Sequence, residues 1–189
     1  MAMPAFEPRH WTAAEVQALP DDPSRRYECV DGVLLMSPTP RAAHQSAVLL
    51  LAMALETLVR PIGLGAVFVA PSEWVLDPRT LVQPDVYVVP LAAGHRPRTD
   101  DERGTPLLFV EVLSPGTARY DRVVKRGRYQ HANIEYWIVD LDSRLVERWL
   151  PGEERPTIHA ERIVWQPAGA AQPFVIELEP FFFEVLGPA

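Results

Sequence analysis

The chain has 189 residues, of which 48% are hydrophobic and 23% are charged. A chain of this size and composition can bury a full apolar core, so disorder over most of its length is excluded. Its formal net charge of −7 argues against broad, charge-driven binding of nucleic acid, which needs a strongly basic surface.

Prolines and hydrophobic periodicity divide the chain into short helices and strands. The apolar runs in its middle are typical of strands that helices cover on both faces. We therefore predict a mixed α/β fold, with one domain over residues 1–189 and a central mixed β-sheet flanked by helices. In chain order, the predicted elements are a helix at 12–19, strands at 27–30 and 33–36, a helix at 41–60, a strand pair at 66–70 and 73–76, strands at 86–89 and 107–113, a helix at 119–131, paired strands at 136–141 and 145–150, weaker strands at 162–165 and 174–178, and a final segment at 181–186.

Two local motifs fix where elements begin and turn. Thr12 and Glu15 form a capping-box pattern, which opens a helix. Asp31-Gly32 between two apolar runs is a strong β-hairpin signal.

The sequence also carries signals about the compartment of the protein. Its first ten residues show no apolar core and no cleavage site of a secretory signal. The longest apolar stretch, near residues 47–55, is shorter than the roughly 18 residues needed to cross a bilayer. The single cysteine, Cys29, cannot form an internal disulfide. We expect a cytoplasmic protein with no membrane partner.

Three acidic residues stand in or beside apolar strands. Glu111 alternates with apolar neighbours on one face of its strand, Asp85 begins the strand at 86–89, and Glu28 lies in the first hairpin. Each has an ordinary explanation: a structural salt bridge to an arginine for Glu111, a turn cap for Asp85, and a solvent-facing position for Glu28. Together, however, two or three carboxylates are the usual protein part of a Mg²⁺ site, because Mg²⁺ prefers oxygen ligands and keeps several waters.

Lys125 is the only lysine among 18 basic residues. It shares one face of the helix at 119–131 with Asp121 and Tyr129, which are spaced by four residues. Either Asp121 and Lys125 form an ordinary exposed pair, or the helix packs across the strand of Glu111 and directs Lys125 at the carboxylates. The second alternative would explain why arginine, with its broad planar fork, does not replace this lysine.

Several motifs occur in a fixed order along the chain: Tyr27-Glu-Cys-Val-Asp-Gly32, Ser37-Pro38, His44-Gln45, Gln83-Pro84-Asp85, Glu111-Val-Leu-Ser-Pro115, the series Asp121, Lys125 and Tyr129, and Glu135-Tyr-Trp-Ile-Val-Asp140. In this order and spacing they resemble the bacterial Uma-type putative restriction endonuclease family, a branch of the PD-(D/E)XK nuclease superfamily. The resemblance covers residues 12–150 and is weaker over 151–189.

The resemblance implies a Mg²⁺-dependent endonuclease of the restriction-endonuclease-like fold. Asp85 would match the aspartate of the superfamily motif, Glu111 its second acid, and Glu28 an additional acid from an early element. The lysine expected two residues after the acid is Leu113 here; in similar families it has moved to the following helix, where Lys125 stands.

The expected reaction is hydrolysis of a phosphodiester, most simply in DNA, by a water that Mg²⁺ or Mn²⁺ activates. Asp85, Glu111, Glu28 and the Val112 carbonyl would hold the metal, and Lys125 would act electrostatically. His44 either contacts a phosphate, supports Glu28 or is a core histidine with satisfied hydrogen bonds. Tyr129 either binds a site carboxylate or only packs.

Basic residues gather on the predicted helix at 119–131 and could contact a phosphate backbone locally, although a solvated helix face would show the same pattern. The residues in question are Arg119, Arg122, Arg126 and Arg128. Two other functions stay open: a non-catalytic interaction module that keeps the nuclease fold, and a metal-dependent hydrolase of RNA or nucleotides. A homodimer would let two sites address the two strands of a duplex.

Overall fold

The computed structural model describes residues 9–114 and 116–188 of the chain. These residues form two compact units. The small unit contains residues 9–39 and Glu73–Gln83, and the large unit contains Pro40–Ser72 and the residues from Pro84 onward. The expectation of a single domain over the whole chain stays a prediction, because each unit is described by itself.

The small unit is built on an antiparallel sheet with the strand order β2-β1-β5-β4. The capping box of Thr12 and Glu15 is confirmed, since the Glu15 N–H donates to Thr12 Oγ1 and the Thr12 N–H to Glu15 Oε2. The hairpin is confirmed as well, because Asp31 and Gly32 both adopt positive φ angles, as a two-residue turn of this kind requires. The elements of this unit are α1 (Ala13–Gln17), β1 (Arg25–Val30), β2 (Val33–Pro38), β4 (Trp74–Asp77) and β5 (Thr80–Val82).

The large unit is built on a six-stranded sheet with the order β10-β9-β8-β7-β6-β3. Strands β7 and β8 are parallel and the other neighbours antiparallel, so the predicted mixed sheet is confirmed. The elements are α2 (Ala42–Val59), β3 (Gly65–Val69), β6 (Val86–Pro90), η1 (Asp100–Glu102), β7 (Leu108–Val112), α3 (Ala118–Tyr120), η2 (Asp121–Lys125), α4 (Arg126–His131), β8 (Tyr136–Asp140), β9 (Leu145–Trp149), β10 (Thr157–His159), β11 (Arg162–Trp165), β12 (Phe174–Glu177) and α5 (Leu178–Leu186).

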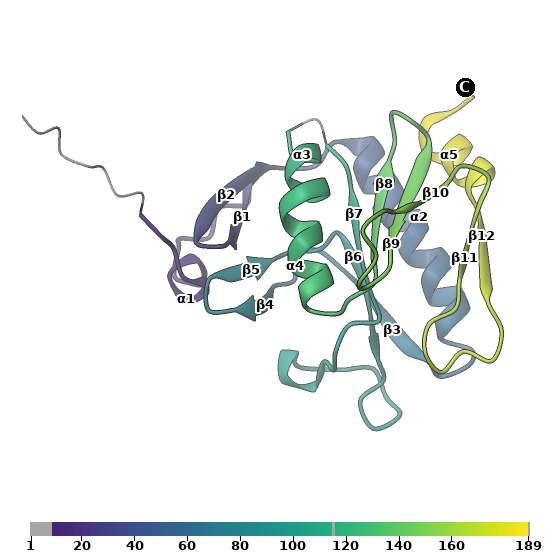
Figure 1. Cartoon of the computed structure of the whole chain (residues 1–189), viewed down its shortest axis with the longest axis horizontal. Coiled ribbons are helices and arrows are strands. Elements are labelled where there is room, and N and C mark those ends of the chain that lie inside the picture. Colours follow the sequence, from purple (N-terminus) through teal and green to yellow (C-terminus); the bar gives the residue numbers. More distant parts are fainter. Residues whose placement is uncertain (1–8, 115, 189) are drawn as a thin grey trace, which may run out of the picture. The chain divides into compact units, whose positions relative to one another are not determined.

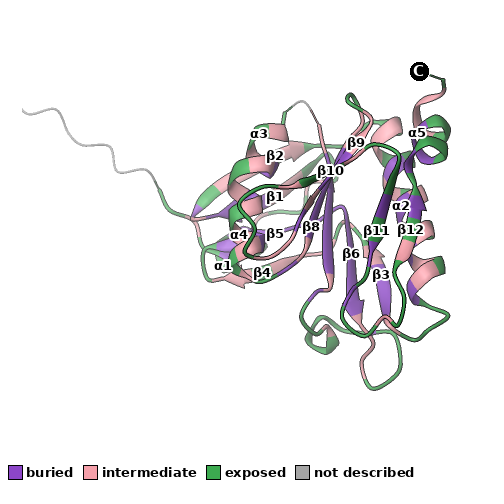
Figure 2. Ribbon diagram, turned by 45° about the vertical axis from the view of Figure 1, so that its right-hand side comes forward, coloured by how far each residue is buried: buried purple, intermediate pink, exposed green. Residues whose placement is uncertain are grey.

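Helices cover both faces of this six-stranded sheet. Helix α2 lies behind the strands in Figure 1, and the continuous helix α3-η2-α4 lies in front of them. The two faces follow from the alternation of side chains along each strand. In β7, Leu108, Val110 and Val112 enter the core beneath α2 and α5, whereas the Phe109 ring contacts Tyr129 of α4 on the opposite face. Figure 2 shows how fully the central strands are buried.

Sheet membership differs from the prediction in one place. The strands near residues 66–70 and 73–76 do not pair with each other: β3 pairs with β6, whereas β4 pairs with β5 in the sheet of the small unit. Within the described residues, two antiparallel sheets accompany the central mixed sheet: that of the small unit and the pair β11 and β12. Short-range patterns report that a strand exists, but its partner depends on long-range packing, which explains the error.

Helix α2 has 18 residues and a mean hydropathy of 1.5, so by length and composition alone it could cross a membrane. This corrects the expectation that no stretch reaches that length. The observation is weak support for a membrane span, because the core helix of a soluble protein passes the same test. Its buried residues recur every four positions and join the core against the sheet; they are Ala47, Leu51, Leu55 and Val59.

Candidate active site

Two acids lie side by side on adjacent strands of the large unit. Glu111 belongs to β7, and Asp85 immediately precedes β6. The antiparallel register pairs Val86 with Val110, so continuing it by one residue places Asp85 opposite Glu111. The Val112 N–H donates a hydrogen bond to Asp85 Oδ2 at 2.9 Å. Both acids are buried, at 2% and 4% exposure, so neither is an ordinary surface carboxylate.

His44, in the first turn of α2, supports one of these acids. Its Nε2 lies 3.1 Å from Asp85 Oδ2, and its side chain is mostly buried. Within the described residues, its Nδ1 is buried and has no hydrogen-bond partner. His44 is therefore not a core histidine whose hydrogen bonds are all satisfied, and the carboxylate it contacts is Asp85.

The helix α3-η2-α4 brings Lys125 to the other acid, Glu111. Lys125 Nζ lies 2.9 Å from Glu111 Oε1 and 3.5 Å from Asp121 Oδ1. Tyr129 donates its hydroxyl to the same Glu111 oxygen at 3.1 Å. The alternative of an exposed Asp121–Lys125 pair is thus wrong, because both side chains are buried. The helix crosses the strand of Glu111 and directs Lys125 at its carboxylate.

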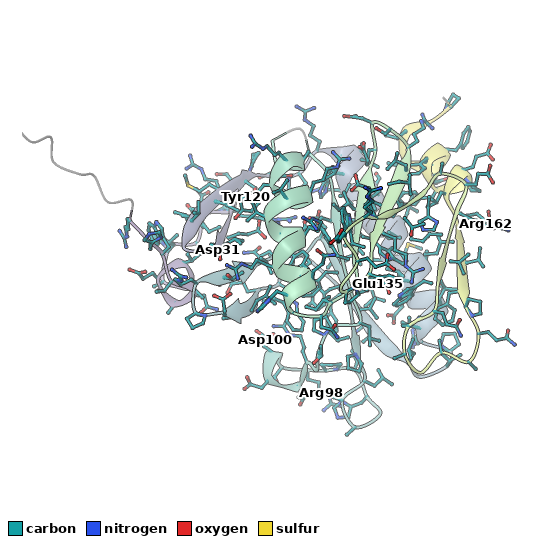
Figure 3. The ribbon with its side chains drawn as sticks, in the orientation of Figure 1. Asp31, Arg98, Asp100, Tyr120, Glu135 and Arg162 are labelled. Atoms are coloured by element: carbon teal, nitrogen blue, oxygen red, sulfur yellow. The ribbon has the colours of Figure 1, made fainter. Side chains whose placement is uncertain are left out.

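The middle of this helix is π-helical, and this widened turn aligns the site residues. Residues four apart in a regular α-helix drift by about 40° around its axis, because 3.6 residues complete a turn. The wider turn of η2 reverses part of that drift. Asp121, Lys125 and Tyr129 consequently all remain on the buried face. Figure 3 labels Tyr120, which immediately precedes this π-helical turn.

Aromatic rings wall the site on the side of α4. The Tyr129 ring packs edge-on between Phe109 and Tyr136, with centroid distances of 4.9 and 4.8 Å. Burial raises the pKa of the Tyr136 hydroxyl well above its usual value, and the nearby carboxylates of Asp121 and Glu111 raise it further. Tyr136 therefore stays a neutral hydrogen-bond donor.

We expect Tyr129→Phe to lower the free energy of unfolding by about 2 kcal/mol, because a buried carboxylate loses a hydroxyl donor while the ring packing remains. Urea unfolding followed by far-UV circular dichroism would measure the change. A loss below about 0.5 kcal/mol, the usual effect of a neutral surface substitution, would contradict a role for this hydroxyl in holding Glu111.

Glu28 lies in the small unit, on β1. It is buried and accepts the Gln83 N–H at 2.7 Å, so the ordinary explanation of a solvent-facing side chain is wrong. Its part in the site of Asp85 and Glu111 stays a prediction.

The four arginines of the helix differ in their surroundings. Arg122 donates to Asp140 at 2.7 Å and to Glu147 at 2.6 Å, so its guanidinium holds two strand carboxylates. Arg126 donates to Gln130 and covers the Trp149 ring. Arg128 is half-buried and Arg119 exposed. Arg122 and Arg126 thus have structural partners, and their contact with nucleic acid stays a prediction, as it does for Arg119 and Arg128.

Sequence reasoning missed the partners of Arg122, although a signal for one of them existed. Glu147 alternates with Leu145 and Trp149 along β9, as Glu111 alternates with apolar residues along β7. Its buried carboxylate is the same kind of exception to an apolar pattern. Asp140 ends β8 and carried no comparable signal.

Asp140 gives the fold a contribution that depends on pH. Burial alone would raise the pKa of Asp140, but the Ser143 N–H and the Arg122 guanidinium outweigh it and lower the pKa below its usual 3.8. The carboxylate therefore stabilises the fold above about pH 3.8, and this contribution is lost as the pH falls through the lowered value. We expect the melting temperature of Asp140→Asn to fall less steeply than that of the wild type between pH 4 and pH 2. Equal slopes in thermal melts would contradict this expectation.

Comparison with known proteins bears on what the site does. A family model described as "Uma2: Putative restriction endonuclease" matches residues 13–178, most of the chain. The chain belongs to the Uma2 family. A crystal structure of a putative nuclease of DUF820 from Anabaena variabilis is similar to it, with a TM-score of 0.74 and 19% sequence identity over 93% of this chain and 99% of that one. At this identity the likeness shows a shared fold. No curated protein matches the chain.

Membership in the Uma2 family agrees with the resemblance inferred from the ordered motifs, although Pro115, which ends one of them, lies outside the described residues. The family name raises the question of a metal ion. Over residues 9–114 and 116–188, no group of three or more His, Cys, Asp and Glu is placed to hold one. The pair Asp85 and Glu111 is nevertheless a donor set that fits Mg²⁺, because this ion often binds only one or two carboxylates and keeps waters in its remaining coordination positions.

Proposed function

We propose that this member of the Uma2 family is a Mg²⁺-dependent endonuclease that hydrolyses phosphodiester bonds in DNA. The observation that carries the proposal is the buried arrangement of Asp85, Glu111 and Lys125, in which an ammonium lies 2.9 Å from one of two carboxylates on adjacent strands. Paired carboxylates beside a lysine offer cation ligands and a positive charge in one place, as attack on a phosphate requires.

Each residue has a role that follows from its contacts. Asp85 and Glu111 would hold the cation, with the Val112 carbonyl as a further oxygen ligand. Bound Mg²⁺ would stabilise negative charge on the phosphate and make a bound water more acidic. His44 holds Asp85, and Tyr129 orients Glu111. Lys125 would neutralise charge that develops on the phosphate, for which a compact ammonium on a flexible stem is suited.

Positive charge close to the site, rather than the net charge of the chain, would attract the DNA substrate. The chain is acidic overall, so long-range attraction to DNA is weak. The exposed Arg119 lies at the start of the helix that carries Lys125, and a positive charge there would favour a phosphate backbone close to the site. Mn²⁺ would replace Mg²⁺, since it accepts the same oxygen ligands.

The test is incubation of the full chain with supercoiled plasmid, single-stranded DNA and RNA, each with Mg²⁺, Mn²⁺ or EDTA. We expect nicking of plasmid that needs a divalent cation and that Lys125→Ala removes. Cleavage of RNA alone would assign the site to the alternative class of RNA hydrolases. No cleavage of any substrate, with a correctly folded protein, would favour a non-catalytic module and overturn the proposal.

A further inference from the structure

Lys125 is shared between two carboxylates that lie on different elements. Its Nζ is 2.9 Å from Glu111 Oε1 on β7 and 3.5 Å from Asp121 Oδ1, one turn earlier on its own helix. All three side chains are at most 5% exposed. The ammonium thus lies closer to the acid proposed to bind metal, with a second carboxylate within reach.

This geometry stabilises the metal-free form of the protein. Two neighbouring buried carboxylates repel each other, and an ammonium beside them offsets that repulsion. When a dication joins Glu111, the ammonium at the same oxygen is repelled, and this repulsion is strong where water is excluded. The flexible lysine stem lets Nζ move toward Asp121, whereas a planar guanidinium bound to two acids could not shift as freely.

We infer that, in the metal-free protein, the positive charge of Lys125 lies beside Glu111 where the charge of the metal would otherwise be. When a divalent cation binds, the ammonium shifts to Asp121, which acts as a positioning residue. The inference rests on the proposed function and deepens it. Each carboxylate then has a cation beside it with and without metal. In the metal-free protein Lys125 lies beside both Glu111 and Asp121, and in the metal-bound protein the metal lies beside Glu111 and Lys125 beside Asp121. The single lysine of the chain would stay at the site throughout.

The inference predicts opposite effects on metal affinity from two neighbouring residues. In Lys125→Met, the competing charge at Glu111 is gone, so Mn²⁺ should bind about tenfold more tightly or better. In Asp121→Asn, the ammonium loses the carboxylate of Asp121 and remains on Glu111, so Mn²⁺ should bind about tenfold more weakly. Isothermal titration of the full chain with MnCl₂ measures both. Asp140→Asn, which removes a partly buried aspartate bound to Arg122, should stay within about twofold of the wild type.

A double variant separates this exchange from a general field effect. If Asp121 acts through Lys125, Asp121→Asn should have almost no effect on Mn²⁺ affinity once Lys125→Met is present. Additive effects would mean that both residues change only the local potential, which would overturn the inference. Weaker or unchanged binding in Lys125→Met would overturn it as well.

Separate control measurements test whether each variant folds and whether the proposed function holds. Circular dichroism and the rise in melting temperature on adding MnCl₂ establish that each variant folds and binds. If Lys125→Met does not fold, the test compares the Mn²⁺ affinities of Asp121→Asn and Asp140→Asn. Equal affinities in these two variants would overturn the inference. A third result is that the wild type binds Mn²⁺ in a way that Asp85→Asn abolishes, while Lys125→Met binds it no more tightly. This result would refute the shift of Lys125 but not the proposed function. No Mn²⁺ binding by the wild type would refute the proposed function too.

Discussion

Asp85→Asn and Glu111→Gln should each reduce plasmid nicking at saturating Mg²⁺ by at least about 10²- to 10³-fold, because each replaces a proposed anionic ligand with a neutral amide of the same shape. The two variants should differ in their metal-free properties. Asp85→Asn changes the acceptor of the Val112 N–H and His44, whereas Glu111→Gln leaves Lys125 with Asp121 as its carboxylate partner.

The matched control is Glu135→Gln, a substitution of the same kind outside the site. Glu135, labelled in Figure 3, precedes β8, and its Oε1 binds Arg148 at 2.7 Å and the Trp137 indole at 2.8 Å. It should retain wild-type nicking within a small factor. Initial rates on supercoiled plasmid measure all three variants, and full activity in Asp85→Asn or Glu111→Gln would exclude the assigned roles of these acids.

Trp137→Ala should destabilise the protein by about 3–5 kcal/mol, the usual cost of truncating a buried tryptophan. Trp137 is fully buried in β8, within the core beneath α2 and α5. Its ring meets Trp165 of β11 edge-on at 5.7 Å, so truncation also removes an aromatic pair. Because β8 is the parallel neighbour of β7, the cavity would form one strand away from Glu111.

Phe183→Ala serves as its control, since it removes another aromatic ring from a helix surface where 58% of the residue is exposed. We expect it to cost no more than about 0.5 kcal/mol. Urea denaturation of both variants gives the comparison. Similar losses in the two variants would contradict a core role for Trp137.

Much of the local structure was predictable because its signals are short-range. The capping box at Thr12, the Asp31-Gly32 turn and the apolar stripe of α2 each depend on residues a few positions apart. The pairing of β8 with β9 was also predictable, since a short turn joins them. The partners of β3 and β4 were not, because neighbouring strands in the chain entered different sheets.

The family, the mixed α/β class and the unusual positions of Asp85, Glu111 and Lys125 were predictable without coordinates. Each of these rests on residue type and on order along the chain. The contacts of these side chains became visible only in the folded chain: Lys125 lies beside Glu111 and Asp121, and His44 contacts Asp85. Such contacts depend on how a π-helical turn and two helices pack over a sheet, and no local pattern specifies that packing. The net charge of −7, which first argued against nucleic acid, therefore says little about a site where buried acids already share a lysine.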